Sequence, residues 1–233
     1  MTIVSAQDDE KAKSEFKPPQ IPTDPIELSD LPKPPDEIAK LIDSGKVKLC
    51  TGRISWSEMR QARDRTGVAG SGYRLAAETK AEFNYDYLSR VRWRQRVEGG
   101  KKILLVTVRF STADLQVKHT IWFRSPPTAD QFWDDAIVQH EFDHVRLSTH
   151  PMIEKQFAKK IRAASSFRHE LADGETIGET LVNSLVRERI KEAIDEISEF
   201  VEVRYKELDR VTRHGLDGVP GDSDVIDWLK HES

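Results

Sequence analysis

Alternating apolar positions in the middle of the chain predict a β-sheet. Phe83, Tyr85 and Tyr87 occupy every second position, which places their side chains on one face of a strand. Residues 98–101, with the sequence Glu-Gly-Gly-Lys, separate this run from a second apolar run at residues 103–110, so the two runs are expected to form a hairpin. A third run alternates on one face at Leu115, Val117, His119, Ile121 and Phe123. Together they predict a small antiparallel sheet of about three or four strands, with His119 as a sheet residue and not a ligand.

Apolar residues at helical spacing predict the first helices. Ile38, Leu41 and Ile42 indicate a short helix, which is followed by a strand at residues 47–51. Ser55 and Glu58 have the spacing of a capping box, which predicts a helix from there to Arg63, and glycines within residues 67–72 end that element.

The second half of the chain has a helical pattern. Thr128 and Gln131 form another capping-box pattern, which predicts the start of a helix whose core face contains Phe132, Trp133, Ala136 and Ile137. Pro151 interrupts this pattern, and a further helix is expected from there to about Phe167. A long apolar face between residues 175 and 215 predicts one helix of nearly forty residues that ends at Gly215.

Composition divides the chain into three parts. Residues 1–35 contain seven of the eleven prolines among charged and small residues, which predicts a disordered proline-rich arm. Residues 36–215 are expected to form one α+β domain. Residues 216–233 are expected to form a tail with a short helix at about residues 225–229.

Charge and cysteine content exclude several classes of protein. The 233-residue chain is 37% hydrophobic, enough for a core, and its net charge of −4 argues against a nucleic-acid partner. The single cysteine, Cys50, allows neither an internal disulfide nor a four-cysteine zinc site. No apolar run is long enough for a membrane span, and the first ten residues include acids where a signal peptide has an apolar core.

The sequence His140-Glu141-Phe-Asp-His144, on the helix that follows Trp133, is the HExxH pattern of zinc peptidases. Histidines four residues apart share one helix face, so both imidazoles can reach one zinc at about 2.0–2.1 Å. Glu141 is then the general base, which takes a proton from the zinc-bound water as that water attacks a peptide carbonyl. The competing interpretation is a charged helix face with two solvated histidines.

A catalytic zinc has three protein ligands, and the sequence offers several candidates for the third. His150 has the spacing of a longer HExxH motif, but Leu147 stands where that motif has a glycine. Glu170, Glu175 and Glu179 are carboxylate candidates from a later segment. His214 follows the long helix and precedes Gly215, a helix-ending residue that would fix its direction.

These residues resemble a bacterial family of unknown function described as secreted zinc-dependent proteases. In that family, a small sheet is followed by a helix that contains a tryptophan and the HExxH motif. Trp133, His140, Glu141 and His144 match this part of the family pattern. A distant Asp-x-x-Thr-x-His-Gly motif matches Asp209, Thr212, His214 and Gly215, and the resemblance covers about residues 46–215. The resemblance implies a zincin-like fold, His214 as the third zinc ligand, and a secreted or periplasmic location.

The function expected from the sequence is that of a zinc-dependent metallopeptidase. Its partner would be a peptide or protein substrate, held as an extended chain along an open edge of the strand at residues 115–123. If that strand is central in the sheet, the run at residues 103–110 or the run at residues 83–88 forms the edge instead. The alternative is a catalytically silent zincin-fold module that binds without turnover. Nothing in the sequence specifies an oligomeric state.

Overall fold

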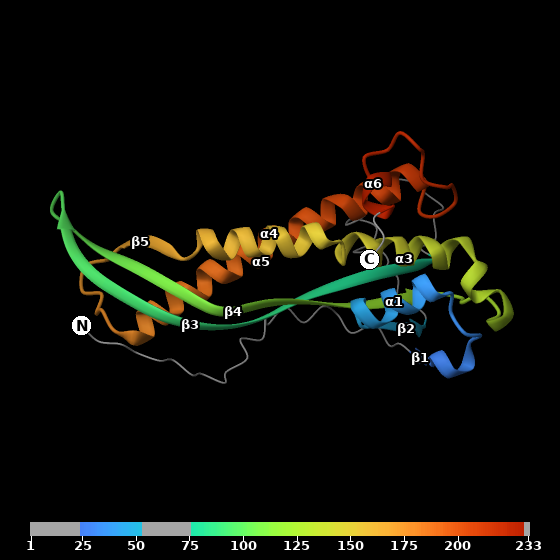
Figure 1. Ribbon diagram of the computed structural model, residues 1–233, viewed down its shortest axis with the longest axis horizontal. Helices are drawn as coiled ribbons and strands as arrows, with labels where there is room; N and C mark the ends of the chain where they lie inside the picture. The colour runs from blue at the N-terminus through green and yellow to red at the C-terminus, as the bar shows by residue number, and fades with distance from the viewer. Residues whose placement is uncertain (1–23, 53–75, 231–233) are drawn as a thin grey trace. The chain divides into compact units, whose positions relative to one another are not determined.

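The computed structural model describes residues 24–52 and 76–230 (Figure 1). The helix expected between Ser55 and Arg63, the glycine-rich break and most of the proline-rich arm lie outside the described residues. The chain forms two compact units. We call residues 83–116 and 152–199 the hairpin unit, and the described parts of 14–82, 117–151 and 200–233 the motif unit, because the latter contains His140 and His144.

The motif unit combines strands with helices that come from distant parts of the chain. Its elements are β1 (Asp24–Ile26), the 3-10 turn η1 (Leu28–Asp30), α1 (Asp36–Gly45), β2 (Val47–Thr51), the start of β3 (Ala77–Glu98), the end of β4 (Lys101–Phe123), η2 (Ala129–Asp134), α3 (Ala136–Ser148), the end of α5 (Glu179–Thr212) and α6 (Ile226–Leu229). The helix and strand expected at residues 36–51 and the short helix near residue 226 are confirmed.

The sheet is mixed and its strand order is β1-β2-β4-β3, with β5 (Ser166–Glu170) also paired to β4. β2 runs parallel to β4, with Val47 beside His119 and Thr51 beside Phe123. The prediction of a wholly antiparallel sheet of three or four strands is therefore wrong. The apolar runs at residues 103–110 and 115–123, expected as separate strands, are one continuous strand, β4. Because β4 lies between β2 and β3, the expected open edge at residues 115–123 is also wrong for the paired residues 119–123.

The core of the motif unit packs α1, β2, β4 and η2 against one face of α3. Val138, Phe142 and Val145 of α3 are fully buried in this cluster, beside the ring of Trp133. The indole Nε1 of Trp133 donates a hydrogen bond of 2.7 Å to the carbonyl of Pro32. β1 also pairs with β2, so residues 24–26 of the expected arm belong to the sheet. Backbone pairing and the Trp133 bond stabilise a segment whose prolines alone predict disorder.

The helix that contains the HExxH motif begins later than the capping-box pattern predicts. Thr128 makes no side-chain cap bond, and the residues after it form the short η2 turn. α3 is capped instead by Asp135, whose Oδ1 accepts hydrogen bonds from the backbone nitrogens of Ile137 and Val138. An N-cap carboxylate satisfies donors that have no partner within the helix, which fixes where α3 starts.

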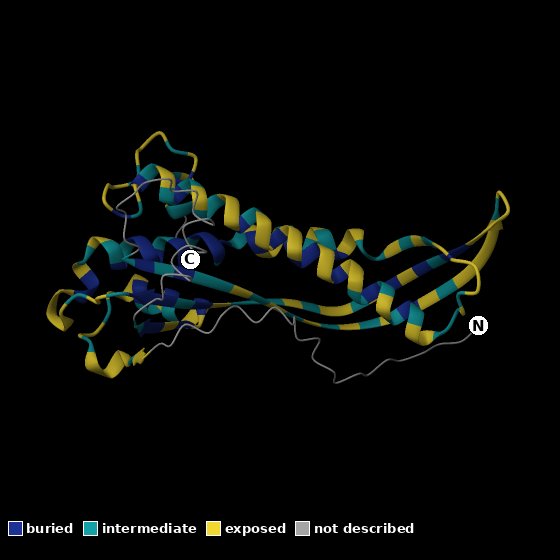
Figure 2. Cartoon of the chain, turned by 180° about the vertical axis from the view of Figure 1, so that it is seen from behind, coloured by how far each residue is buried: buried dark blue, intermediate teal, exposed yellow. Residues whose placement is uncertain are grey.

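The hairpin unit contains most of β3 and β4, together with β5, α4 (Pro151–Ala163) and the first part of α5. The expected hairpin is confirmed: β3 ends at Glu98, β4 begins at Lys101, and Gly99 and Gly100 form the turn with φ of 57° and 82°. Positive φ at both central turn positions favours glycine. Apolar side chains of β3 and β4 pack on α4 and α5, whose exposed and buried faces alternate in Figure 2.

Two helix boundaries differ from the sequence pattern. α4 ends at Ala163, and residues 166–170, expected partly as helix, form the strand β5 against β4. Pairing with β4 decides this segment, which helical spacing cannot foresee. The long helix α5 has 34 residues and ends at Thr212, close to the expected end. Among the described residues, no helix combines the length and apolar character needed to cross a lipid bilayer.

Candidate metal centre

His140 and His144 lie on the face of α3 opposite to its apolar core face. Both side chains are buried, and their ring centroids are 4.7 Å apart. The core residues Val138, Phe142 and Val145 follow one helical stripe, whereas the two histidines and Leu147 follow another. This arrangement fixes α3 in the core while its histidine face is turned toward the end of α5.

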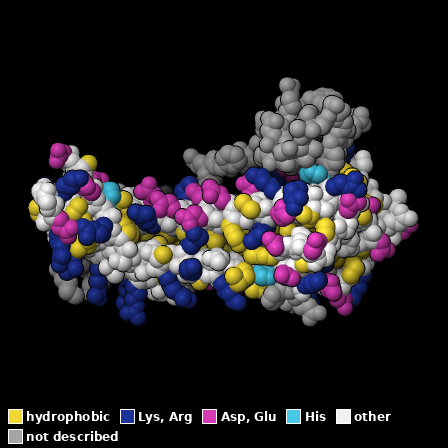
Figure 3. All heavy atoms as spheres, turned by 90° about the horizontal axis from the view of Figure 1, so that it is seen from above, with side chains coloured by type: hydrophobic (Ala, Val, Ile, Leu, Met, Phe, Trp, Pro, Cys, Tyr) yellow, Lys and Arg dark blue, Asp and Glu magenta, His cyan; other side chains and the backbone are white. Residues whose placement is uncertain are grey.

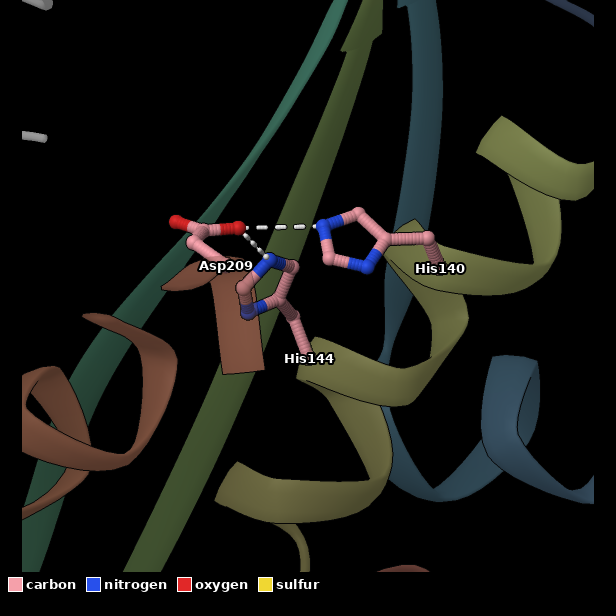
Figure 4. A group of neighbouring side chains, drawn as sticks. All are labelled: His140, His144 and Asp209. Carbon is pink, nitrogen blue, oxygen red and sulfur yellow. Dashed lines mark hydrogen bonds and ion pairs between the residues drawn. The ribbon is translucent and has the colours of Figure 1, made fainter. Parts of the chain in front are cut away.

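The third group at this place is Asp209 of α5 (Figure 4). Its Oδ1 lies 3.0 Å from Nε2 of His140 and 3.1 Å from Nε2 of His144. The three side chains form the one group of metal-ligating type found among the described residues, with ligand atoms within 4.8 Å of one another. Leu208 is fully buried in a cluster with Leu147 of α3, which fixes this end of α5 beside the motif helix.

Asp209 is held in the ionised form by its surroundings. Burial alone would raise its pKa, but hydrogen bonds from His140, His144 and His214 outweigh burial and hold the pKa well below the ordinary value of 3.8. A half-buried carboxylate with several donors around one oxygen is a strong acceptor and a ready metal ligand.

The chain that follows α5 has an unusual backbone. Arg213, His214 and Gly215 all have positive φ, at 50°, 57° and 80°. Left-handed backbone is costly for the two residues with side chains and occurs more often at functional sites. At Gly215 a Cβ atom would lie 2.8 Å from Cβ and 3.0 Å from Cγ of His140. Glycine is therefore required here both for its conformation and for the close approach of the backbone to the histidine.

Thr212 sets the direction of the His140 ring. Its hydroxyl donates to the carbonyl of Leu208 at 2.7 Å and accepts from the backbone nitrogen of Gly215 at 3.2 Å. The remaining neighbour of Oγ1 is Nδ1 of His140 at 3.3 Å, which can only donate because the hydroxyl proton is already committed. Nδ1 of His140 is thus the nitrogen held by Thr212, and Nε2 is the nitrogen directed toward Asp209.

The surroundings of His144 are different. Its Nδ1 is buried without a hydrogen-bond partner among the described residues, and its ring lies against that of Tyr205 with centroids 4.4 Å apart and planes tilted by 58°. Burial raises the pKa of Tyr205, which stays a phenol and donates to Oγ of Ser148 at 2.9 Å. Behind it, Ser148 lies 2.6 Å from Nε2 of His119, whose Nδ1 donates to the carbonyl of Gly45. The expectation that His119 is a structural sheet residue is confirmed.

Glu141 is fully enclosed beside the two histidines. Its Oε2 accepts a hydrogen bond of 2.6 Å from Oγ1 of Thr79, at the start of β3, and the same hydroxyl lies 3.1 Å from the Glu141 carbonyl. Burial raises the pKa of Glu141 to about 7, against the lowering influence of His140 and of the Thr79 bond. A carboxyl group with a pKa near neutrality can both accept and return a proton.

The other candidate ligands lie elsewhere. His214, which the resemblance implies as third ligand, lies beside the group with its Nδ1 3.4 Å from Oδ1 of Asp209, and the ligand-type atoms within 4.8 Å of one another belong to His140, His144 and Asp209. His150 packs its ring on Trp228. Glu170 pairs with Lys101, and Glu175 accepts from Ala172 and His169, all within the hairpin unit. Glu179, the first residue of α5, is not part of the group.

Sequence reasoning missed Asp209, Thr79 and Tyr205 as site residues. Asp209 and Thr212 belong to the motif that the sequence singled out, and their spacing of three residues places both on one face of α5. That spacing was the available signal for a carboxylate ligand. No comparable signal marks Thr79, because its role depends on the approach of β3 to α3. Comparisons with protein-family models, curated proteins and solved structures found no match to this chain.

Proposed function

We propose that this protein is a zinc-dependent metallopeptidase with a zincin-like arrangement. The observation that supports this most is the convergence of two imidazoles and one carboxylate on a single point, with the buried Glu141 next to it in the same helix. The resemblance seen in the sequence points to the same chemistry, and the residues of its second motif lie at this place: Asp209 in the group, Thr212 and Gly215 against His140, and His214 beside Asp209.

The donor set fits zinc. His140 Nε2, His144 Nε2 and Asp209 Oδ1 would hold the ion, because two imidazoles and one carboxylate are a common catalytic zinc set that leaves a position for water. The Nδ1 proton of His140, held by Thr212, leaves Nε2 as the coordinating nitrogen, and hydrogen bonds of this kind orient metal-binding histidines. His214 then supports Asp209 from the side instead of binding the ion itself.

A zinc ion held by these three residues would polarise the peptide carbonyl and would lower the pKa of a water molecule at the site to about 7. Glu141 supplies the proton transfer: its Oε1 accepts a proton from the attacking water and returns it to the departing amine. Thr79 donates to the other oxygen, Oε2, and so keeps Oε1 available. The enclosed position of Glu141 matches its pKa to this task, since burial brings it to about 7.

An extended substrate fits the start of β3 better than the strand first expected. β3 is the outermost strand of the described sheet on this side, whereas β4 is paired on both sides. Thr79 of β3 touches Glu141, so a peptide added to this edge would pass the catalytic group. β-strand addition satisfies the backbone of the substrate with little demand on its side chains.

The test combines metal content with hydrolysis. We expect about one zinc per chain by elemental analysis and cleavage of a mixed peptide library by the wild-type protein. Glu141→Gln should retain the zinc and lose at least about 10²-fold in cleavage rate. Full activity of the Gln variant would remove Glu141 from the mechanism. Zinc binding with no cleavage of any peptide would establish a silent binding module instead.

A further inference from the structure

A row of arginines lies on the outward face of β3 in the hairpin unit. Arg90, Arg92, Arg94 and Arg96 occupy alternate positions and are all exposed. The intervening residues Val91 and Trp93 turn to the opposite face and pack on the core formed with α4 and α5. Alternate residues of a strand share one face, so the four guanidinium groups form a single line.

These arginines have no carboxylate partner among the described residues. The acids close to the turn are already neutralised, because Glu98 pairs with Arg168 and Glu170 pairs with Lys101 at 2.7 Å. Arg109 of β4 is also exposed and without an ion pair within the described chain. Figure 3 shows Lys and Arg side chains projecting along one margin on the side of the β3–β4 turn. In a chain of net charge −4, this local excess of positive charge is a marked asymmetry.

The row coincides with an open backbone edge. β3 is the last strand in the order β1-β2-β4-β3, so its second side has no strand partner among the described residues. In many proteins, charged residues on an edge strand have no role beyond preventing aggregation through that edge. Here, however, the charge is of one sign, regularly spaced and unpaired, which also makes it a complementary surface for a regularly spaced anion.

We propose that the edge of β3 around residues 90–96 binds an acidic, extended peptide segment of a partner protein as an added strand. Along a strand the arginines repeat every ~6.5–7 Å, and acidic side chains at every second residue of an added strand have the same repeat. Each carboxylate can then accept a bidentate bond from one guanidinium, while the backbones pair edge to edge. An extended peptide matches a line of charges on an edge strand better than a membrane does, because a membrane surface is flat. The inference does not depend on the metallopeptidase proposal.

The test measures binding of labelled peptides of about ten residues to the full chain by fluorescence anisotropy. One peptide alternates Glu and Thr, a second has the same composition with its glutamates in one block, and a third is the alternating peptide N-methylated at every second residue. We expect the alternating peptide to bind at least about tenfold more tightly than either control, because only it offers both the charge repeat and a pairing backbone. Equal binding of the three would show a charge effect alone and overturn the proposal.

Variants then locate the surface. Arg92→Gln/Arg94→Gln should weaken binding of the alternating peptide by about tenfold or more. The matched control, Lys155→Gln/Lys159→Gln, removes two exposed charges from α4 and should leave binding unchanged. Arg92→Lys/Arg94→Lys keeps the charge but loses the bidentate geometry, and an intermediate loss is expected. Unchanged binding in the Gln variant, or arginine-dependent binding of phosphatidylglycerol vesicles or single-stranded DNA without binding of the peptide, would contradict the proposal.

Discussion

The two compact units differ in what they bury. The described part of the hairpin unit buries no polar or charged side chain. The motif unit buries eight of them: Thr79, His119, His140, Glu141, His144, Ser148, His150 and Thr212. The hairpin core is built from aliphatic and aromatic side chains alone. Burying a polar group is costly unless it finds a partner, so stability by itself favours the hairpin type of core. The motif unit holds its buried polar groups through hydrogen bonds such as those of His119, and three of the eight, His140, Glu141 and His144, belong to the candidate metal centre.

The largest expected effect is on zinc affinity, which should fall much further when Asp209 is replaced than when His214 is replaced. Asp209→Ala removes the carboxylate that faces both histidines, and zinc affinity should fall by more than the roughly 10–100-fold typical of a supporting residue. His214→Ala removes only a neighbour of Asp209 and should stay within that range. A competition titration with a zinc chelator measures both. The reverse order would make His214 the third ligand, as the sequence resemblance implies.

A Phe→Ala substitution in each unit should affect stability in both units but zinc binding in the motif unit alone. Phe157→Ala in the hairpin core and Phe142→Ala in the motif core both remove a buried ring and should each lower the free energy of unfolding by about 3–5 kcal/mol. Only Phe142→Ala should also weaken zinc binding, because Phe142 lies between the two motif histidines on α3. Denaturant unfolding and elemental analysis give the two values. Equal zinc loss in both variants would contradict a local role for the motif core.

Gly215→Ala tests the close approach of the backbone to His140. The new Cβ would meet the His140 side chain at 2.8 Å in a residue with φ of 80°, so the ring must shift. We expect a loss of about 1–3 kcal/mol in stability and about tenfold or more in zinc affinity. Gly218→Ala is the matched control, since a Cβ there meets no atom within 4 Å. Equal behaviour of the two variants would show that the glycine does not position His140.

Thr79→Val should affect turnover more than binding. The substitution keeps the shape of the side chain but removes the donor to Oε2 of Glu141. We expect kcat to fall by about tenfold with little change in KM, because the lost bond orients the general base and does not contact substrate. Thr79→Ser should restore the rate and the pH profile. A change confined to KM would assign Thr79 to substrate binding.

The smallest effect concerns pH and the buried His119. Burial lowers its pKa below the ordinary value of 6.5, against the raising influence of its bond to Gly45. The unfolded chain therefore takes up a proton before the folded chain does, so the contribution of His119 to stability is complete above about pH 6.5 and is lost as the pH falls below it. His119→Gln should show a shallower decline on this acid side than the wild type. Subtracting the two unfolding curves removes the contribution of Glu141, which is common to both.

Much of the local structure follows from the sequence because its signals act over a few residues. The Gly99-Gly100 turn requires positive φ, and the helical spacing of apolar residues predicts α1 and α5. His140 and His144 share a face because one helical turn separates them. These features depend on local backbone geometry alone, so they can be predicted from the sequence without knowing which other segment packs against them.

The tertiary structure decided what lies far apart in the chain. Asp209 meets the motif histidines across 69 and 65 residues, and Thr79 reaches Glu141 across 62. The parallel pairing of β2 with β4 and the strand β5 likewise depend on segments that meet only after folding. Spacing along one helix cannot specify which carboxylate or hydroxyl arrives from another element, since that depends on how cores such as Leu147 with Leu208 pack. The sequence by itself determined the two histidines and their glutamate, whereas packing of α5 and β3 against α3 decided their partners.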